Sequence, residues 1–235
     1  MVGDLRSAST GREPHPPIVP RGGPRGKLSH RFGRDSVPRL RAMQQGVAFF
    51  LAYLLGSVDF GVIVPRAMGI DIYEQGSGNP GTSNVFRTLG KRAAALVLLG
   101  DGLKGFFAAA IGGIWVDETT AFACGFAAVL GHAFPIWHRF RGGRGVATAI
   151  GAAIYLEPVV GLILAVLWLV LVLVWKVASI ASIIALLLYV PGFVLTGHRG
   201  WQLVWATATA ALVILKHAPN VGRMVQGAER TVRPG

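Results

Sequence analysis

The sequence predicts an all-α polytopic membrane protein with about seven transmembrane helices and glycine- and arginine-rich loops on the cytosolic side. First, 52% of the 235 residues are hydrophobic and only 14% are charged. Second, several apolar runs approach the roughly 20 helical residues that cross a hydrocarbon core about 30 Å thick. Third, polar segments separate these runs, and a run that crosses lipid must be helical because lipid offers its backbone groups no hydrogen-bond partners. A soluble protein of this composition would expose large apolar patches, which excludes that class.

Residues 1–42 differ from the rest of the chain in composition. They hold nine Lys or Arg and three Asp or Glu, with many prolines and glycines and almost no aliphatic runs. Such a segment buries too little apolar surface to offset the entropy of ordering. We therefore expect residues 1–42 to be a disordered basic tail or the product of a misassigned start codon. The transmembrane domain, 43–235, is expected to begin at Met43.

Seven apolar segments follow this tail, and each is expected to form a helix. The first opens with the run GVAFFLAYLLG after Met43. The fourth is short, and Glu157-Pro158 separates it from the fifth, so we expect a partial or re-entrant helix there. The approximate ranges are 46–66, 93–115, 119–137, 145–156, 158–175, 177–197 and 201–217.

The connections between these segments alternate in charge. One set is basic, with Arg87, Lys91, Arg92, Arg139, Arg141, Arg144, Lys176, Lys216, Arg223, Arg230 and Arg233. The opposite set holds Asp117, Glu118, Glu157, His198 and Arg199. Because basic loops stay in the cytosol, both glycine-rich loops and the C-terminus are expected on the cytosolic face of a bacterial plasma membrane. The basic tail would then have to be translocated, which favours a start at Met43.

The first glycine-rich loop reads GSGNPGTSNVFRTLGK from Gly76 to Lys91. Its glycines permit the tight backbone that wraps a phosphate, and its neutral donors and one arginine match an anion. The glycines are Gly76, Gly78 and Gly81, and the polar side chains are Ser77, Asn79, Thr82, Ser83, Asn84 and Arg87. The alternative interpretation is a flexible polar loop between two helices.

The second loop reads GHAFPIWHRFRGGRGV from Gly131 to Val146. It repeats the combination of glycines and arginines with Gly142, Gly143, Gly145, Arg139, Arg141 and Arg144. These arginines also fit a pure topology signal. His132 fits either a substrate contact or a buried helix-end histidine bonded to a backbone carbonyl.

Three ionisable residues fall within the apolar segments. Asp101 and Lys104 are three residues apart on one helical face and are expected to pair, either structurally or facing substrate. Asp59 has no partner close in sequence, and its role stays open. Cys124 is the only cysteine, and no His, Cys, Asp or Glu cluster has the spacing of metal ligands, so we expect neither a metal nor another cofactor.

Two further polar groups lie near the predicted cytosolic ends of the last segments. Ser179 follows Lys176, and His217, Asn220, Arg223 and Glu229 follow the final apolar run. Because His217, Asn220 and Arg223 are spaced three residues apart, their side chains would line one face of a helix or turn.

These motifs resemble those of the bacterial acyl-phosphate:glycerol-3-phosphate acyltransferases, small polytopic membrane enzymes that begin phospholipid synthesis. The likeness covers about residues 47–229 and implies a seven-span fold with every motif on the cytosolic side. It rests on the first loop, on DGLKG at 101–105, on GHAFPIWHRFRGGRGVATAIG at 131–151, on VASIAS around Ser179, and on the spacing of His217, Asn220, Arg223 and Glu229.

The resemblance implies a reaction in which glycerol 3-phosphate attacks an acyl phosphate through its 1-hydroxyl, giving 1-acylglycerol 3-phosphate and phosphate. Ser77, Arg87 and Ser179 are expected near the acyl phosphate, while Arg141, Arg144, His217 and Asn220 are expected to bind and orient phosphate. The residues implied as catalytic are Ser77, Arg87, Ser179, His217 and Asn220. Those implied in substrate binding are Gly76, Gly78, Asn79, Gly81, Asn84, Lys104, His132, Arg141, Gly142, Gly143, Arg144, Gly145, Arg223 and Glu229.

The chain departs from the family pattern at two places. Arg141 and Arg144 flank the glycines where lysines are frequent, which keeps the charge but changes the donor geometry. Asp59 stands where proline or serine is more usual.

The rival interpretation is a transporter or channel for a phosphorylated metabolite. Against it, the polar clusters gather at one membrane face, whereas transporter sites commonly lie near the midplane. A second rival, a membrane anchor that binds soluble phosphate or nucleic acid, rests only on the basic tail. The pI near 11 is also compatible with nucleic acid, but phosphate substrates and anionic lipids attract the same charges. We expect membrane lipids as partners, no nucleic acid, and a monomer.

Overall fold

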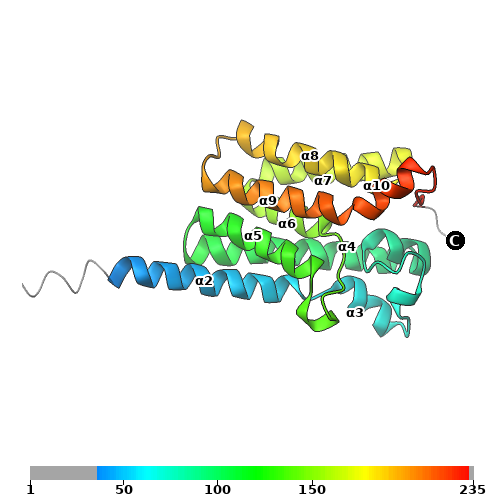
Figure 1. Cartoon of the computed structure of the whole chain (residues 1–235), viewed down its shortest axis with the longest axis horizontal. Helices are drawn as coiled ribbons and strands as arrows, with labels where there is room; N and C mark the ends of the chain where they lie inside the picture. The colour runs from blue at the N-terminus through cyan, green and yellow to red at the C-terminus, as the bar shows by residue number, and fades with distance from the viewer. Residues whose placement is uncertain (1–35, 233–235) are drawn as a thin grey trace, which may run out of the picture. The chain divides into compact units, whose positions relative to one another are not determined.

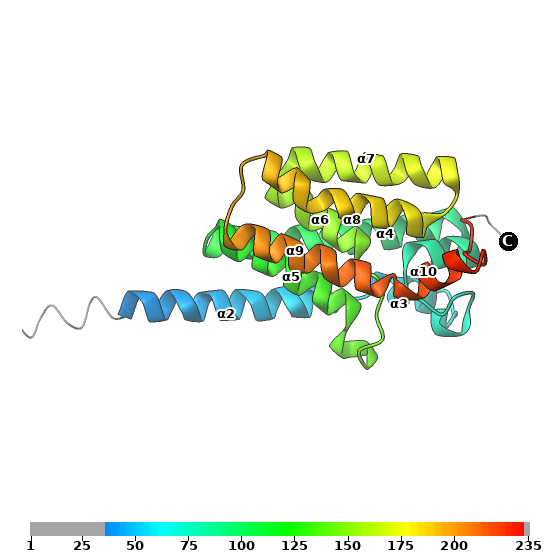
Figure 2. The same ribbon diagram turned by 45° about the horizontal axis from the view of Figure 1, so that its top comes forward.

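The structure, a computed structural model, describes residues 36–232. Within that range the chain forms helices and no β-strand (Figures 1 and 2). The elements are α2 (Ser36–Gly56), α3 (Phe60–Ala67), η1 (Ile72–Glu74), α4 (Thr82–Trp115), α5 (Glu118–Ala133), η2 (Ile136–His138), α6 (Val146–Leu156), α7 (Pro158–Trp175), α8 (Ala178–Leu195), α9 (Trp201–Lys216) and α10 (Ala218–Val225).

All seven predicted apolar segments are helical, which confirms the all-α membrane fold. Five stretches are long and apolar enough to cross a membrane by length and composition. They are Pro38–Ala67, Thr82–Trp115, Glu118–His138, Pro158–Trp175 and Ala178–Leu195. The other two, α6 and α9, have 11 and 16 residues. The short fourth segment is thus present, and a count of seven crossings stays a prediction.

The ends of the first two segments differ from the prediction. Residues 57–59 divide the first segment into α2 and α3, and the carboxylate of Asp59 caps α3 by accepting from Gly61 N at 3.0 Å. The second segment begins at Thr82, because residues 82–89 form a helix that is kinked at Gly90 (φ 81°). The last part of the first glycine-rich loop is therefore helical.

The predicted tail, 1–42, falls mostly outside the described residues. Its final part, from Ser36, is helical, and α2 continues through Met43 without a break. Arg41 forms an ion pair with Asp117, at the start of α5. Helix α2 therefore extends across the predicted boundary at Met43, and the division into a tail and a transmembrane domain stays a prediction.

Close backbone contacts between helices depend on glycine. A Cβ at Gly151 of α6 would overlap the carbonyl oxygen of Gly102 in α4, and one at Gly105 would overlap that of Thr148. Gly56 at the end of α2 approaches Ala128 of α5 in the same way. Small residues let helices pack by direct backbone contact where lipid supplies no hydrophobic drive for association. This packing holds α4 and α6, the helices that follow the two glycine-rich loops, against each other.

The basic connections and the opposite set, which holds Asp117, Glu157 and His198, lie at opposite ends of the helical bundle. The α8–α9 turn lies at one end, while α10 and the start of α4 lie at the other (Figures 1 and 2). His198 in the α8–α9 turn pairs with Glu118 at 3.2 Å, as expected for residues that share one end.

Candidate functional site

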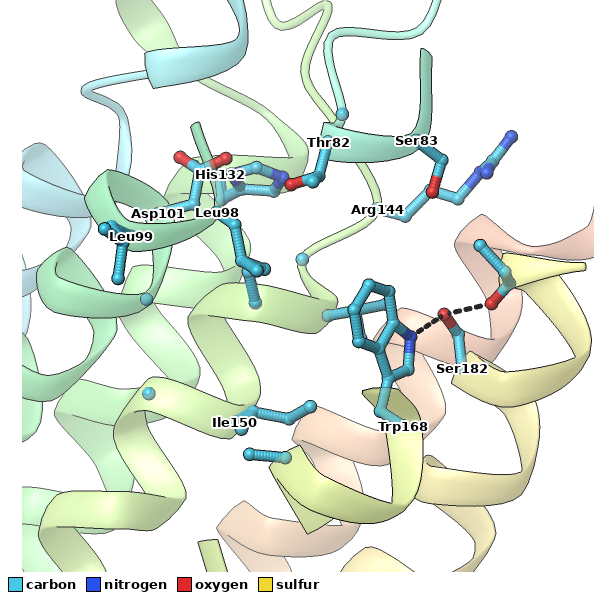
Figure 3. A pocket seen from close by; sticks show the side chains of 18 of the residues that line it. Thr82, Ser83, Leu98, Leu99, Asp101, His132, Arg144, Ile150, Trp168 and Ser182 are labelled. Carbon is cyan, nitrogen blue, oxygen red and sulfur yellow. Dashed lines mark hydrogen bonds and ion pairs between the residues drawn. The ribbon is translucent and has the colours of Figure 1, made fainter. Parts of the chain in front are cut away.

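A cavity of about 620 Å³ lies between α4, α6, α7 and α8 (Figure 3). One part of its wall is polar and comes from the two glycine-rich loops and the starts of helices. The other part is apolar and comes from the middle of α4, α6 and α7. Both halves belong to the same cavity, so a ligand with an anionic head and an apolar tail fits it.

Three helices begin at the polar wall. The first-turn residues that line the cavity are Thr82 and Ser83 of α4, Val146 and Ala147 of α6, and Ala178 and Ser179 of α8. The first N–H groups of a helix have no partner inside that helix and carry the positive end of its dipole. Three such ends around one cavity make an anion site.

Asn84 organises the first glycine-rich loop. Its side chain is 2% exposed, accepts from Ser77 N at 2.9 Å and from Arg87 Nη2 at 3.3 Å, and donates to Gln75 O at 2.9 Å. A Cβ at Gly76, which has a φ of 57°, would overlap the amide of Asn84. The loop is thus held in one shape, which disfavours the flexible-loop alternative.

The first loop contributes five predicted residues to the cavity wall: Ser77, Asn79, Gly81, Asn84 and Arg87. Gly76 and Gly78 lie behind them. The N–H groups of Ser77, Gly78 and Gly81 donate to acceptors within the loop, so they are not available to contact an anion. The first-turn donors of α4 are the better candidates.

The second loop packs tightly on His132. A Cβ at Gly142 would overlap the carbonyl oxygen of His132, and one at Gly143 would overlap its imidazole Nε2. Gly143 N donates to His132 O at 3.1 Å. These two glycines therefore pack closely against His132 and are not among the residues that line the cavity, whereas Arg144 and Gly145 line it. Their role in phosphate binding stays a prediction.

The two arginines of the second loop have different surroundings. Burial lowers the pKa of Arg144 to about 10, and nearby Arg223 acts in the same direction. Arg141 is exposed, lies 4.7 Å from the Tyr73 ring centre and is outside the cavity wall. Of these two arginines, Arg144 is thus the partly desolvated cation that an incoming anion would meet.

Glu229 joins three other predicted residues from two parts of the chain. Its carboxylate accepts from Ser179 Oγ at 2.8 Å, from Asn220 Nδ2 at 2.6 Å and from Arg223 Nε at 3.0 Å. Burial opposes ionisation, but these hydrogen bonds hold the pKa of Glu229 below its usual value. Of the four, only Ser179 lines the cavity. Glu229 holds the Ser179 hydroxyl by a hydrogen bond, and Asn220 and Arg223 hold Glu229.

His217 lines the cavity beside this cluster. Its Nδ1 lies 2.7 Å from Val213 O, which can only accept, so Nδ1 donates and Nε2 is the acceptor in the neutral ring. Burial lowers the pKa of His217 to about 4, and the ring is neutral at pH 7. A neutral Nε2 can orient a hydroxyl group.

A buried polar cluster lies next to the cavity. Lys104 Nζ is 2.8 Å from Asp101 Oδ1, 2.8 Å from His132 Nδ1 and 2.7 Å from Val58 O. The predicted Asp101–Lys104 pair is confirmed. Lys104 is not part of the cavity wall, whereas Asp101 and His132 are. The His132 side chain bonds to Lys104 rather than to a backbone carbonyl.

Asp59 also belongs to this cluster, although it has no partner close in sequence. Ligand-type atoms of Asp59, Asp101 and His132 lie within 4.8 Å of one another, close enough for one metal ion to contact all three. Lys104 Nζ already contacts two of them, so the protein supplies its own cation there.

The apolar part of the cavity opens sideways between α4 and α7. Leu99 and Phe107 of α4 are 62% and 54% exposed, and Val166 of α7 is 60% exposed. Trp168 lines the cavity and donates from Nε1 to Ser182 Oγ at 3.0 Å (Figure 3). An acyl chain could therefore lie in this groove and reach the surrounding lipid.

The fold and the cavity thus define a class of membrane protein: a helical bundle in which a polar, basic site is joined to a laterally open apolar groove. A family model described as glycerol-3-phosphate acyltransferase matches residues 46–227. The chain therefore belongs to the glycerol-3-phosphate acyltransferase family, and the acyltransferase class predicted from the motifs is confirmed.

Individual relatives agree with this assignment. The glycerol-3-phosphate acyltransferase of Rubrobacter xylanophilus is 41% identical over 193 residues, which cover 80% of this chain and 95% of the relative. That of Neisseria meningitidis serogroup B is 38% identical over 193 residues, with 79% and 96% covered. The crystal structure of PlsY (YgiH), an integral membrane glycerol 3-phosphate acyltransferase in its glycerol 3-phosphate form, superposes with a TM-score of 0.76 at 36% identity, covering 80% and 94%.

Proposed function

We propose that this protein transfers a fatty acyl group from acyl phosphate to the 1-hydroxyl of glycerol 3-phosphate. The products are 1-acylglycerol 3-phosphate and phosphate, and the reaction is the first step of phospholipid synthesis. The observation that supports this most strongly is the single cavity that joins three helix N-termini and Arg87 and Arg144 to a groove open to lipid. The PlsY structures are described as glycerol 3-phosphate and lysophosphatidic acid forms, which match the acceptor and the product of this reaction.

In the proposed reaction the protein orients the reactants and stabilises negative charge. The 1-hydroxyl oxygen bonds to the acyl carbonyl carbon, the bond from that carbon to the phosphate oxygen breaks, and a phosphate oxygen takes the hydroxyl proton. Acyl phosphate is already activated, so positioning and fixed positive dipoles supply most of what catalysis requires. Ser77, Arg87 and Ser179 are placed near the acyl phosphate, and Arg144 binds a phosphate.

The residues around Ser179 and His217 have supporting roles in this proposal. Glu229 fixes the Ser179 hydroxyl, while Asn220 and Arg223 fix Glu229. His217 orients the acceptor hydroxyl through Nε2. We also propose that the active form is a monomer.

The donor can be tested directly with purified protein in detergent. Acyl phosphate with labelled glycerol 3-phosphate is expected to give a labelled lipid, and acyl-CoA is expected not to replace acyl phosphate. The polar wall fits a compact anion rather than a long pantetheine arm. Turnover with acyl-CoA alone would contradict the donor assignment. Uptake of labelled glycerol 3-phosphate into proteoliposomes without lipid formation would favour the transporter alternative.

We also propose that the cavity's polar end faces the cytosol of a bacterial cell. In a variant with Cys124 replaced by alanine, a cysteine at Arg139 or Gly222 is expected to stay unlabelled by an impermeant reagent added outside cells. A cysteine at Thr119 is expected to be labelled. Both Arg139 and Gly222 are exposed, so protection would come from the membrane. Labelling of both from outside would reverse the orientation.

A further inference from the structure

The chain that follows α10 folds back onto the start of α8. Gly227, with a φ of 67°, lies just after α10 and turns the chain, as a glycine in the left-handed region commonly does at the end of a helix. Glu229 then accepts from Ser179 Oγ at 2.8 Å, and Val232 N donates to Lys176 O at 2.6 Å. The segment between these two contacts is therefore held at the polar wall, where α8 begins.

Arg230 lies in this segment, directly after Glu229. The end of the bundle that holds α10 also holds the start of α4 (Figures 1 and 2), and the charge of Arg230 acts on the guanidinium groups of Arg87 and Arg144. Both of those arginines line the cavity. Arg230 itself is exposed, and among residues 36–232 no carboxylate pairs with its side chain. A third guanidinium group thus adjoins the polar wall.

The arginines at the polar wall carry more charge than the described chain balances there. The strongest charges near Arg144 are one carboxylate and three further arginines, which are Glu229, Arg223, Arg87 and Arg230. Glu229 Oε2 accepts from Arg223 Nε at 3.0 Å, so within residues 36–232 the other three guanidinium groups have no carboxylate partner. Like charges that converge repel one another unless an anion lies between them. A phosphate dianion, which accepts bidentate hydrogen bonds from guanidinium groups, fits this arrangement.

We infer that Arg230 is a substrate-binding residue that contacts a substrate phosphate together with Arg87 and Arg144. The inference rests on the proposed function for the identity of that phosphate, which belongs either to acyl phosphate or to glycerol 3-phosphate. The alternative is that Arg230 only helps to set membrane orientation, for which any positive charge suffices. A phosphate contact differs because it depends on the planar guanidinium and changes substrate affinity.

The test is steady-state kinetics of Arg230→Gln and Arg230→Lys, purified in detergent without anionic lipid. Glycerol 3-phosphate is varied at saturating acyl phosphate, and acyl phosphate is then varied at saturating glycerol 3-phosphate. We expect Arg230→Gln to raise KM about five- to tenfold in one of the two series with little change in kcat, as the loss of one charge-assisted hydrogen bond at an exposed site predicts. Arg230→Lys should recover part of the affinity. The series in which KM rises identifies the phosphate, and wild-type KM values in both would overturn the inference.

Lys176→Gln is the matched control. Lys176 is exposed and adjoins the same segment, but it contacts Val232 through its backbone carbonyl, which the substitution keeps. We expect wild-type KM values in both series. An equal rise of KM in Lys176→Gln would mean that the loss of any positive charge at this face weakens binding, and the inference would fall. It would also fall if Arg230→Gln matched the wild type in detergent and lost activity only in vesicles that contain anionic lipid, since Arg230 would then bind lipid headgroups.

Phosphate binding separates this inference from the proposed function. The affinity for inorganic phosphate is measured by isothermal titration calorimetry on the same preparations, and Arg230→Gln is expected to bind about five- to tenfold more weakly than the wild type. That result without a labelled lipid from any preparation would refute the proposed function and leave the role of Arg230 supported. A labelled lipid, with equal phosphate affinity and equal KM values in the wild type and Arg230→Gln, would support the proposed function and refute the role of Arg230.

Discussion

Arg87→Ala is expected to lower kcat/KM for acyl transfer at least about tenfold. Arg87 lines the polar wall and is held by Asn84 at 3.3 Å, with most of its guanidinium donors available to a phosphoryl group. A hydrogen bond to a charged group contributes about 1.5–3 kcal/mol net, and each 1.4 kcal/mol is a factor of ten in rate. The measurement is steady-state kinetics on purified protein at matched concentration.

Arg87→Lys distinguishes a role of Arg87 in substrate binding from a role in setting membrane orientation. A lysine supplies a point charge but not the planar fork, so we expect only partial recovery if Arg87 binds phosphate. A topology signal needs only the charge, and lysine would then be fully equivalent. Arg92 is a matched control, since it lies on the same helix, is exposed and is outside the cavity wall. Wild-type activity in Arg87→Lys, with only a loss of membrane yield in Arg87→Ala, would show that Arg87 does not bind substrate.

The helices could be predicted from sequence because their signal is local. Long apolar runs and the separator Glu157-Pro158 report directly on where lipid-crossing helices and a short helix lie. Their ends were less predictable. Residues 82–89 form a polar helix, and the kink at Gly90 shows only in its backbone angles. Hydropathy therefore assigned residues 82–89 to a loop.

The polar cluster of Asp59 could not be predicted because its members come from the linker between α2 and α3 and from the helices α4 and α5. Asp59 and His132 are brought together by the glycine-mediated contact of α2 with α5, and no spacing in the sequence records that contact. The link between Ser179 and Glu229 spans 50 residues for the same reason.

The glycines illustrate a second limit. The density of glycines indicated that the backbone approaches another group closely. Sequence alone could not tell whether the approached group was a ligand or another part of the chain. At Gly142 and Gly143 it is His132, while at Gly81 the backbone does reach the cavity.

The approach of α4 to α6 leads to the largest expected effect on stability. Gly151→Ala is expected to lower the free energy of unfolding by about 3 kcal/mol or more, the upper part of the usual cost of overpacking. The added Cβ would overlap the carbonyl oxygen of Gly102, and backbone atoms of two packed helices cannot rotate away as a flexible side chain can. At about 2–4 °C per kcal/mol, the melting temperature in detergent should fall by about 6–12 °C or more.

Activity should fall together with this stability. Because α6 begins directly after Arg144 and Gly145, moving α6 away from α4 displaces the second loop and one of the three helix N-termini at the polar wall. Gly46→Ala is the matched control, since Gly46 lies in α2, has no atom within 4 Å of an added Cβ, and should be neutral or more stable by about 0.5–1 kcal/mol. If Gly151→Ala instead melts like the wild type and keeps its activity, α4 and α6 do not meet through Gly102 and Gly151, and the polar wall is not built on that contact.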